Sequence, residues 1–270
     1  MKVEFSPLAY NTIIGAPVRT GGTQPAVVEQ PITREPAIIE RTDRFERTPQ
    51  TSPISSPNGA NMPANPQKFI EKYVNRDVVQ NAIEKNPEIT RILKRNGLEA
   101  KISEKNIDKS LQRHLFTTYL NAVGIAKQAK IDAKTTAKIA QAALLHDIGK
   151  ALIPEEIIQK PSDLTFDEYR IVRLHSKLGA EILKTTDIDP DVIEAIELHH
   201  ENKNHARKTA CTIAKILSVA DVHSALREKR SYKAPKEDED VFREMREMKF
   251  LTQDYVTHLA NYRYMIKPVK

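Results

Sequence analysis

The feature that most constrains the fold of this chain is a set of ionisable residues on the apolar faces of five helical segments. His175 follows Ile171 by four residues, and Asp221 follows Leu217 by the same spacing, so both face the buried side of a helix. The whole set is His114, His146, Asp147, His175, His199, His200 and Asp221. Burying these groups without compensation would cost on the order of several kcal/mol per charged group. The fold must therefore gather them around something that removes this cost.

Each member of the set, taken alone, has an ordinary explanation. A lone histidine on an apolar face is more often a hydrogen-bonded core residue than a metal ligand, and a lone aspartate at a helix end is usually a cap. Taken together they indicate a metal centre, because divalent ions bound by imidazole and carboxylate remove the cost of burial. The mixed nitrogen and oxygen ligand set suits iron, manganese or zinc.

The hydrophobic pattern after residue 66 is helical, and no alternation indicates a strand, so the expected fold class is all-α. Caps and prolines mark the helix ends; Asp189 before Pro190, for example, is typical of an N-cap followed by a first-turn proline. Pro154 opens a short helical turn. Longer helical segments are expected over 67–85, 87–97, 108–128, 132–146, 165–184, 190–202, 207–228, 237–248 and 252–265.

The segment before these helices has a different composition. Residues 1–66 hold ten of the sixteen prolines, with many Thr and Ser residues, and no helical or strand period lasts there. Such a segment cannot bury enough apolar surface to offset its ordering entropy. We therefore expect a disordered Pro/Thr/Ser-rich tail over 1–66, a helical lead-in over 67–105 and the main domain over 106–270. The tail could recruit a protein partner.

The composition also indicates the cellular compartment of the protein and the kinds of partner that it binds. Cys211 is the only cysteine, so no intrachain disulfide can form. No run approaches the ~18–20 apolar residues of a membrane span, and the N-terminus lacks the apolar core of a signal peptide, which predicts a cytoplasmic protein without a membrane partner. The net charge of +6 lies in 67–270, because residues 1–66 carry six charges of each sign. This mildly basic body suits an anionic substrate and lacks the basic and aromatic pattern of a nucleic-acid binder.

Three segments together resemble a known family. Residues 146–183 read HDIGKALIPEEIIQKPSDLTFDEYRIVRLHSKLGAEIL, residues 113–131 read RHLFTTYLNAVGIAKQAKI, and residues 220–233 read ADVHSALREKRSYK. They closely resemble the HD-GYP family, a branch of the HD superfamily of metal-dependent phosphohydrolases. The resemblance covers about residues 106–265 and keeps many separated residues in order and kind.

This resemblance implies an HD-domain helical bundle with a two-metal site whose ligands are the seven residues named above. Asp147 would bridge both ions, and a metal-bridging hydroxide would attack phosphorus in a nucleotide or cyclic dinucleotide. Lys150 matches the phosphate-contacting lysine of the HDxxK motif, so Asp147 and Lys150 are the expected catalytic residues. Arg230 and Lys233 match basic residues that hold substrate phosphates. The family commonly uses iron or manganese, and zinc is the alternative.

Three departures from the family pattern bear on function. HHE at 199–201 leads almost directly into the next helix, where the family has a loop containing Gly-Tyr-Pro. Ser110 stands where some members carry a glutamate that supports a third metal, so we expect two ions. Ser224 replaces the second aspartate of the family's ADVxDAL segment. His205 and His223 lie close enough in sequence to add weak ligation.

The expected function is therefore that of a metal-dependent phosphohydrolase or phosphodiesterase acting on a nucleotide or cyclic dinucleotide. The alternative is a non-catalytic signalling module that keeps the metal site and binds a nucleotide or a partner without cleaving it. The complete ligand set favours the enzyme, and the missing loop together with Ser224 favours the alternative.

Overall fold

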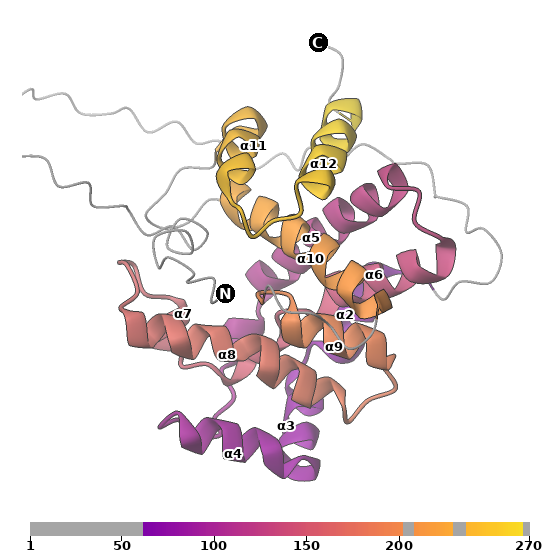
Figure 1. Ribbon diagram of the computed structural model, residues 1–270. Coiled ribbons are helices and arrows are strands. Elements are labelled where there is room, and N and C mark those ends of the chain that lie inside the picture. The colour runs from indigo at the N-terminus through magenta and orange to yellow at the C-terminus, as the bar shows by residue number, and fades with distance from the viewer. Residues whose placement is uncertain (1–61, 202–207, 229–235, 267–270) are drawn as a thin grey trace, which may run out of the picture.

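The computed structural model describes residues 62–201, 208–228 and 236–266, which form helices and their connections without a strand (Figure 1). The all-α fold class is thereby confirmed for this part of the chain. The disordered tail expected over 1–66 falls outside the described residues, apart from 62–66. Within the same ranges, no helix is both long enough and apolar enough to cross a membrane.

Five helices build the body of the protein: α5 (Lys109–Gln128), α6 (Ala133–Leu145), α8 (Phe166–Leu183), α9 (Pro190–Leu198) and α10 (Lys208–Arg227). The short element η1 (Glu104–Ile107) precedes α5, and two others, η2 (Ile148–Leu152) and α7 (Glu155–Ile158), connect α6 to α8. Two further helices pack against α10 and α5: α11 (Asp238–Glu247) and α12 (Gln253–Ile266).

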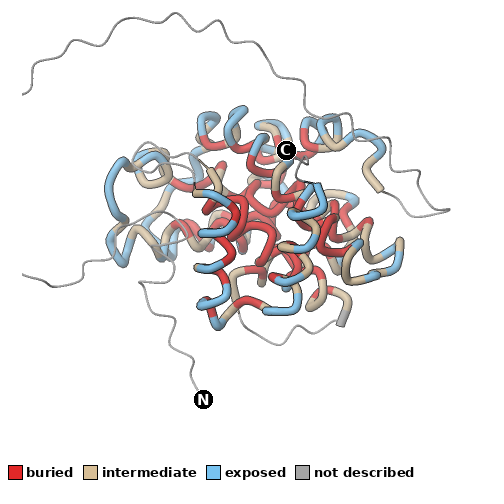
Figure 2. The backbone as a smooth tube through the Cα atoms, turned by 90° about the horizontal axis from the view of Figure 1, so that it is seen from above, coloured by how far each residue is buried: buried red, intermediate tan, exposed pale blue. Residues whose placement is uncertain are grey.

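Alanines on α6 allow the helices of the body to pack closely. Ala137, Ala140, Ala142 and Ala143 are all buried, and α6 contacts α5, α9 and α10 along this surface. Small side chains let neighbouring helix backbones approach each other. Figure 2 shows the result: the buried backbone gathers in the centre of the body, and exposed segments lie around it.

Three short helices precede the body: α2 (Pro66–Tyr73), α3 (Arg76–Lys85) and α4 (Pro87–Arg95). The single helical segment expected over 67–85 is instead two helices, because Val74 leaves the helical conformation and the Asn75 side chain caps α3 by accepting the Val78 N–H. The buried residues of these three helices belong to the same hydrophobic core as the body. The domain boundary placed between 105 and 106 stays a prediction.

A pair of glycines brings η2 against α8. A Cβ atom on Gly149 would lie 2.0 Å from the carbonyl oxygen of His175 and 2.5 Å from the backbone nitrogen of Gly179. Only a residue without a side chain allows this approach. The contact matters for the site, because it sets the segment that follows Asp147 directly beside His175.

Candidate metal centre

The fold brings the seven candidate ligands to one centre. They come from α5, the C-terminal end of α6, α8, the C-terminal end of α9, and α10. Six are buried and His200 is half-buried. Three groups have ligand atoms within 4.8 Å of one another: His114–His146–Asp147, His146–His199–Asp221 and His175–His199–His200. The sequence expectation that these residues share one site agrees with this geometry, and their role as ligands stays a prediction.

Asp147 lies at the middle of the centre, and its two oxygens face different neighbours. Its Oδ2 atom is 3.4 Å from Nε2 of both His114 and His146, whereas its Oδ1 atom is 3.4 Å from Nε2 of His175. The side chain is only 2% exposed. A carboxylate held in this way can contribute one oxygen to each of two neighbouring positions.

Asp221 completes one side of the centre. Its Oδ1 atom lies 3.0 Å from Nε2 of His114 and 3.5 Å from Nε2 of His146. On the other side, Nε2 of His200 lies 3.1 Å from Nε2 of His175. One side therefore gathers two carboxylates with imidazoles, and the other gathers imidazoles around a single carboxylate oxygen.

Three of the imidazoles are anchored through their outer nitrogens. Nδ1 of His146 lies 3.1 Å from the carbonyl oxygen of Ala143. Nδ1 of His175 lies 2.6 Å from the carbonyl oxygen of Val172, and Nδ1 of His199 lies 2.6 Å from that of Ile196. Because a carbonyl only accepts, Nδ1 must carry the proton and donate it. The lone pair then lies on Nε2, on the side that faces the centre.

Two of these inward nitrogens have no hydrogen-bond partner in the described part of the chain. Nε2 of His146 and Nε2 of His199 are both buried and unpaired. A buried polar atom without a partner costs free energy, so such atoms call for an explanation. Two unprotonated nitrogens beside two buried carboxylates fit a divalent cation, and the donor set suits iron, manganese or zinc.

Burial sets the protonation states of the histidine-rich side. It lowers the pKa of His175 to about 4. Burial, followed by the nearby His146 and His175, lowers the pKa of His199 to about 3. Burial also lowers the pKa of His200 well below its usual value. These three imidazoles are therefore neutral near pH 7, which is the form that binds metals.

The two carboxylates are charged although they too are buried. Burial alone would raise the pKa of Asp147, but the charge of Lys150 and the neighbouring histidines holds that pKa well below its ordinary range. Burial would likewise raise the pKa of Asp221, but its hydrogen bond with His114 and the nearby His146 imidazole hold that pKa low. Both groups are therefore anionic at neutral pH, and the centre attracts cations.

Lys150 lies at the edge of the centre, on η2. Its Nζ atom donates to Oδ2 of Asp147 at 2.6 Å, and its side chain is 26% exposed. Its ammonium group thus reaches both the centre and the solvent. The other two basic residues expected to bind phosphate, Arg230 and Lys233, lie outside the described residues, as does His205.

His223 is turned away from the candidate ligands. Its Nδ1 atom lies 3.1 Å from Nδ2 of Asn121, and its Nε2 atom lies 3.3 Å from Oδ1 of Asp238. Ser224 belongs to the same arrangement, because its hydroxyl accepts from Nδ2 of Asn121 at 3.1 Å. His223 does not join any group of possible ligands within the described ranges. The weak ligation expected for it is not supported.

The sequence reasoning missed two residues that support the centre. Oε1 of Glu228 lies 2.7 Å from Nδ1 of His114, and Nη2 of Arg173 donates to the His200 carbonyl at 3.1 Å. Burial would lower the pKa of His114, but hydrogen bonds to Asp221 and Glu228 outweigh burial and raise it to about 10. One signal could have found Glu228: it follows Asp221 by seven residues, two helical turns, and so shares its face of α10.

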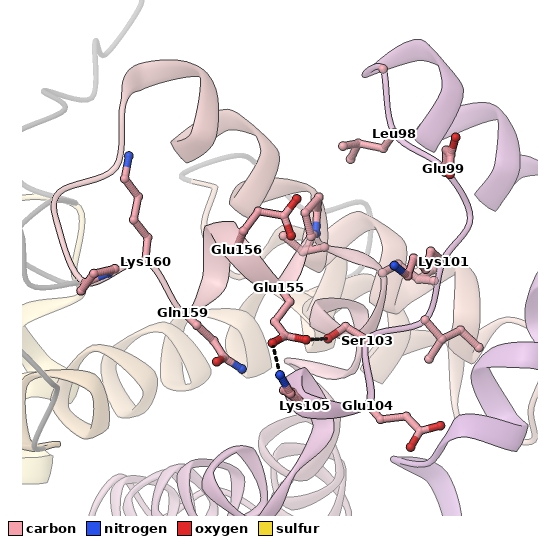
Figure 3. A pocket seen from close by; sticks show the side chains of 16 residues that line it. Leu98, Glu99, Lys101, Ser103, Glu104, Lys105, Glu155, Glu156, Gln159 and Lys160 are labelled. Atoms are coloured by element: carbon pink, nitrogen blue, oxygen red, sulfur yellow. Dashed lines mark hydrogen bonds and ion pairs between the residues drawn. The ribbon is translucent and has the colours of Figure 1, made fainter.

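A large groove of about 1050 Å³ lies elsewhere, between the 97–105 segment and the 152–161 segment (Figure 3). Glu155 bonds across it to Lys105 at 2.6 Å and to Ser103 at 3.5 Å. None of the seven candidate ligands lines this groove. It is therefore separate from the metal centre.

Comparison with known proteins identifies the family. A family model described as HD domain matches residues 99–254, which is more than half of the chain. The chain belongs to the HD domain family. The match begins before the boundary expected at residue 106 and includes all seven candidate ligands. It confirms the HD-superfamily resemblance, and the HD family binds divalent metals.

Curated relatives of this HD-domain chain act on phosphodiesters. A cyclic di-GMP phosphodiesterase of Pseudomonas aeruginosa is 28% identical over 146 residues, 51% of this chain and 35% of that protein. A 3'3'-cGAMP-specific phosphodiesterase of Vibrio cholerae is 35% identical over 116 residues, 40% of this chain and 22% of that protein. A ribonuclease Y of Mycoplasma capricolum is 36% identical over 110 residues, 41% of this chain and 17% of that protein. The chain thus spans about a third or less of the length of these relatives.

Proposed function

We propose that this chain is a metal-dependent phosphodiesterase that hydrolyses a nucleotide or a cyclic dinucleotide. The observation that carries the proposal is the buried centre in which two carboxylates face inward imidazole nitrogens. Nε2 of His146 and of His199 is buried and lacks a hydrogen-bond partner among the described residues. Ions bound there would remove that cost, and membership of the HD family supports the same interpretation.

The proposed centre has two ion positions that share Asp147. The carboxylate-rich position comprises His114, His146, Asp147 and Asp221. The histidine-rich position comprises His175, His199, His200 and Asp147. Two divalent cations, iron or manganese first and zinc as the alternative, would acidify a water molecule and neutralise the oxygens of the substrate phosphate.

The protein's own residues would hold and orient the substrate. Asp147 keeps both ion positions in register, because each of its oxygens faces one of them. Lys150 lies where its ammonium can leave Asp147 and bind a non-bridging phosphate oxygen. Arg230 and Lys233 are proposed, on the motif alone, to bind the remaining phosphate charge.

Two of the relatives named above support a cyclic dinucleotide as the substrate, since one acts on cyclic di-GMP and another on 3'3'-cGAMP. The absence of the Gly-Tyr-Pro loop from the sequence after 199–201 means that the groups which select the bases must differ from those of the HD-GYP family. The phosphodiester is therefore a firmer part of the proposal than the bases attached to it.

A second candidate function is hydrolysis of RNA. The likeness to ribonuclease Y favours it, at an identity no lower than that of the cyclic dinucleotide enzymes. The same centre could serve both reactions, because both break a phosphodiester bond by in-line attack of water. The two candidates differ only in what lies on either side of the phosphate.

The test is a substrate panel assayed with manganese, ferrous iron or zinc. The panel contains cyclic di-GMP, 3'3'-cGAMP, a short single-stranded RNA and an aryl phosphodiester. Asp147→Asn keeps the shape of the side chain and removes its charge. It should lower turnover by more than ~100-fold, since loss of outer partners of metal ligands alone costs 10–100-fold. The matched control is Asp187→Asn, an exposed aspartate on the surface, which should leave turnover unchanged.

Each outcome decides between the functions. Turnover of a cyclic dinucleotide that is lost in Asp147→Asn and kept in Asp187→Asn supports the first proposal, and turnover of RNA alone supports the second. Tight binding of a cyclic dinucleotide by the metal-loaded protein without turnover would favour the non-catalytic signalling module. Equal turnover in wild type and Asp147→Asn would refute catalysis at this centre.

A further inference from the structure

His114 is held from outside the centre in a different way from its neighbours. His146, His175 and His199 place Nδ1 on a carbonyl oxygen of their own chain three residues earlier. Nδ1 of His114, on α5, instead lies 2.7 Å from Oε1 of Glu228. Glu228 directly follows Arg227, the last residue of α10. A charge-assisted hydrogen bond of this length is stronger than one to a neutral carbonyl.

The two proposed ion positions therefore differ in charge. The carboxylate-rich position has Asp147 and Asp221 beside the ion, and Glu228 adds a third negative group behind His114. The histidine-rich position has three imidazoles and shares only Asp147. A position surrounded by more negative charge holds a divalent cation more strongly, in particular where water is excluded.

We propose that Glu228 is a positioning residue that makes the carboxylate-rich position the tighter of the two, so that this position fills first. The carboxylate fixes the His114 ring with Nε2 toward Asp221 and Asp147, and it strengthens the imidazole as a ligand. This inference rests on the proposed function only in assuming that ions bind at the centre. It does not depend on which substrate is hydrolysed.

The place of Glu228 suits a role that can be tested without unfolding the protein. Its side chain is 33% exposed, and a glutamine at this position keeps an oxygen that can accept from Nδ1 of the buried His114. Its distance of seven residues from Asp221 places both on the same face of the helix. A loss of the Glu228 carboxylate should thus act on His114 and leave the helix packing in place.

The experiment is a stepwise titration of the chelator-stripped full chain with zinc alone, in competition with a chromophoric chelator. Wild type should show a tight and a weaker step. Glu228→Gln should weaken the tight step 10–100-fold and leave the weaker step unchanged. Glu228→Asp keeps the charge with a shorter reach and should fall between them. His200→Ala identifies the histidine-rich step, because only that step should be lost.

Glu237→Gln is the matched control. It makes the same change of net charge at the N-cap of α11, on a side chain that is 81% exposed and pairs with Arg227, the last residue of α10, rather than with the centre. Its two steps should equal those of wild type. Unchanged steps in Glu228→Gln, or equal weakening of both steps at an unchanged melting temperature, would overturn the inference. A wild type that binds no zinc, manganese or iron would overturn the proposed function as well.

Discussion

Gly149 and Gly179 face each other where η2 crosses α8, but they differ sharply in the room available for a side chain. A Cβ atom at position 149 would lie 2.0 Å from the His175 carbonyl oxygen, and both of its nearest groups are backbone. A Cβ atom at position 179 would meet its nearest atoms, the Gly149 nitrogen and a methyl group of Ile148, at 3.4 Å, an ordinary contact. The same substitution should therefore have opposite effects at these two positions.

The magnitude follows from the distances. To accommodate Gly149→Ala, η2 must move away from α8 by roughly 1 Å or more, since 2.0 Å must become an allowed contact. Overpacking of this kind costs about 1–3 kcal/mol or more, which lowers the melting temperature by roughly 2–12 °C in a domain of this size. Gly179→Ala lies inside a helix and should instead stabilise the protein by roughly 0.5–1 kcal/mol.

The assay is urea and thermal unfolding of both variants without metal, followed by metal analysis. Because Asp147 lies two residues before Gly149 and 3.4 Å from His175, the shift should also weaken ion binding in Gly149→Ala. Gly179→Ala should bind ions as wild type does. If Gly149→Ala were as stable as wild type, or if Gly179→Ala were the more destabilised variant, close packing of η2 on α8 would not require glycine at position 149.

Two further predictions concern charge. At neutral pH, manganese at about 100 times its dissociation constant should stabilise the stripped protein by ~2.7 kcal/mol for each occupied site, and the His146→Ala/Asp147→Ala double variant should lose this response in thermal unfolding. Burial would raise the pKa of Asp238, but His223, Arg263 and Arg227 hold it below its usual value. The resulting stabilisation is complete above the unfolded pKa of ~3.9 and is lost as pH falls through the folded-state pKa. The difference in unfolding free energy between wild type and Asp238→Asn should therefore shrink below about pH 4; a difference that stays constant down to pH 2.5 would contradict this.

Helix positions were the part of the fold that the sequence predicted best, because side chains next to the helix ends determine them. Asp132 caps α6, Thr165 caps α8, and Asp189 caps α9 ahead of a first-turn proline. The error over 67–85 has the same origin. Asn75 has the cap function that Asn86 has eleven residues later, but no proline follows it to mark the break.

The candidate site was predictable in part for a related reason. Helical periodicity places His114, His175 and Asp221 on buried faces, but it cannot say how far apart those faces lie. Nε2 of His114 and Oδ1 of Asp221 lie 3.0 Å apart, although the two residues are more than a hundred positions apart in the sequence. Glu228 was missed because its side chain is partly exposed and gives no hydrophobic signal; only its two-turn spacing from Asp221 placed it near the centre.

The ends of α6 and α9 explain why histidine serves so well at this centre. The last four carbonyls of a helix have no partner within it. Ala143 and Ile196 belong to the last turns of these two helices, and their carbonyls accept Nδ1–H from His146 and His199, the residues that cap them. One imidazole thus satisfies a free carbonyl and presents Nε2 to the centre. A histidine that directly follows a buried apolar helix, with Nδ1 on the carbonyl three residues earlier, therefore has its proton on Nδ1 and its lone pair on Nε2, which points away from the helix end.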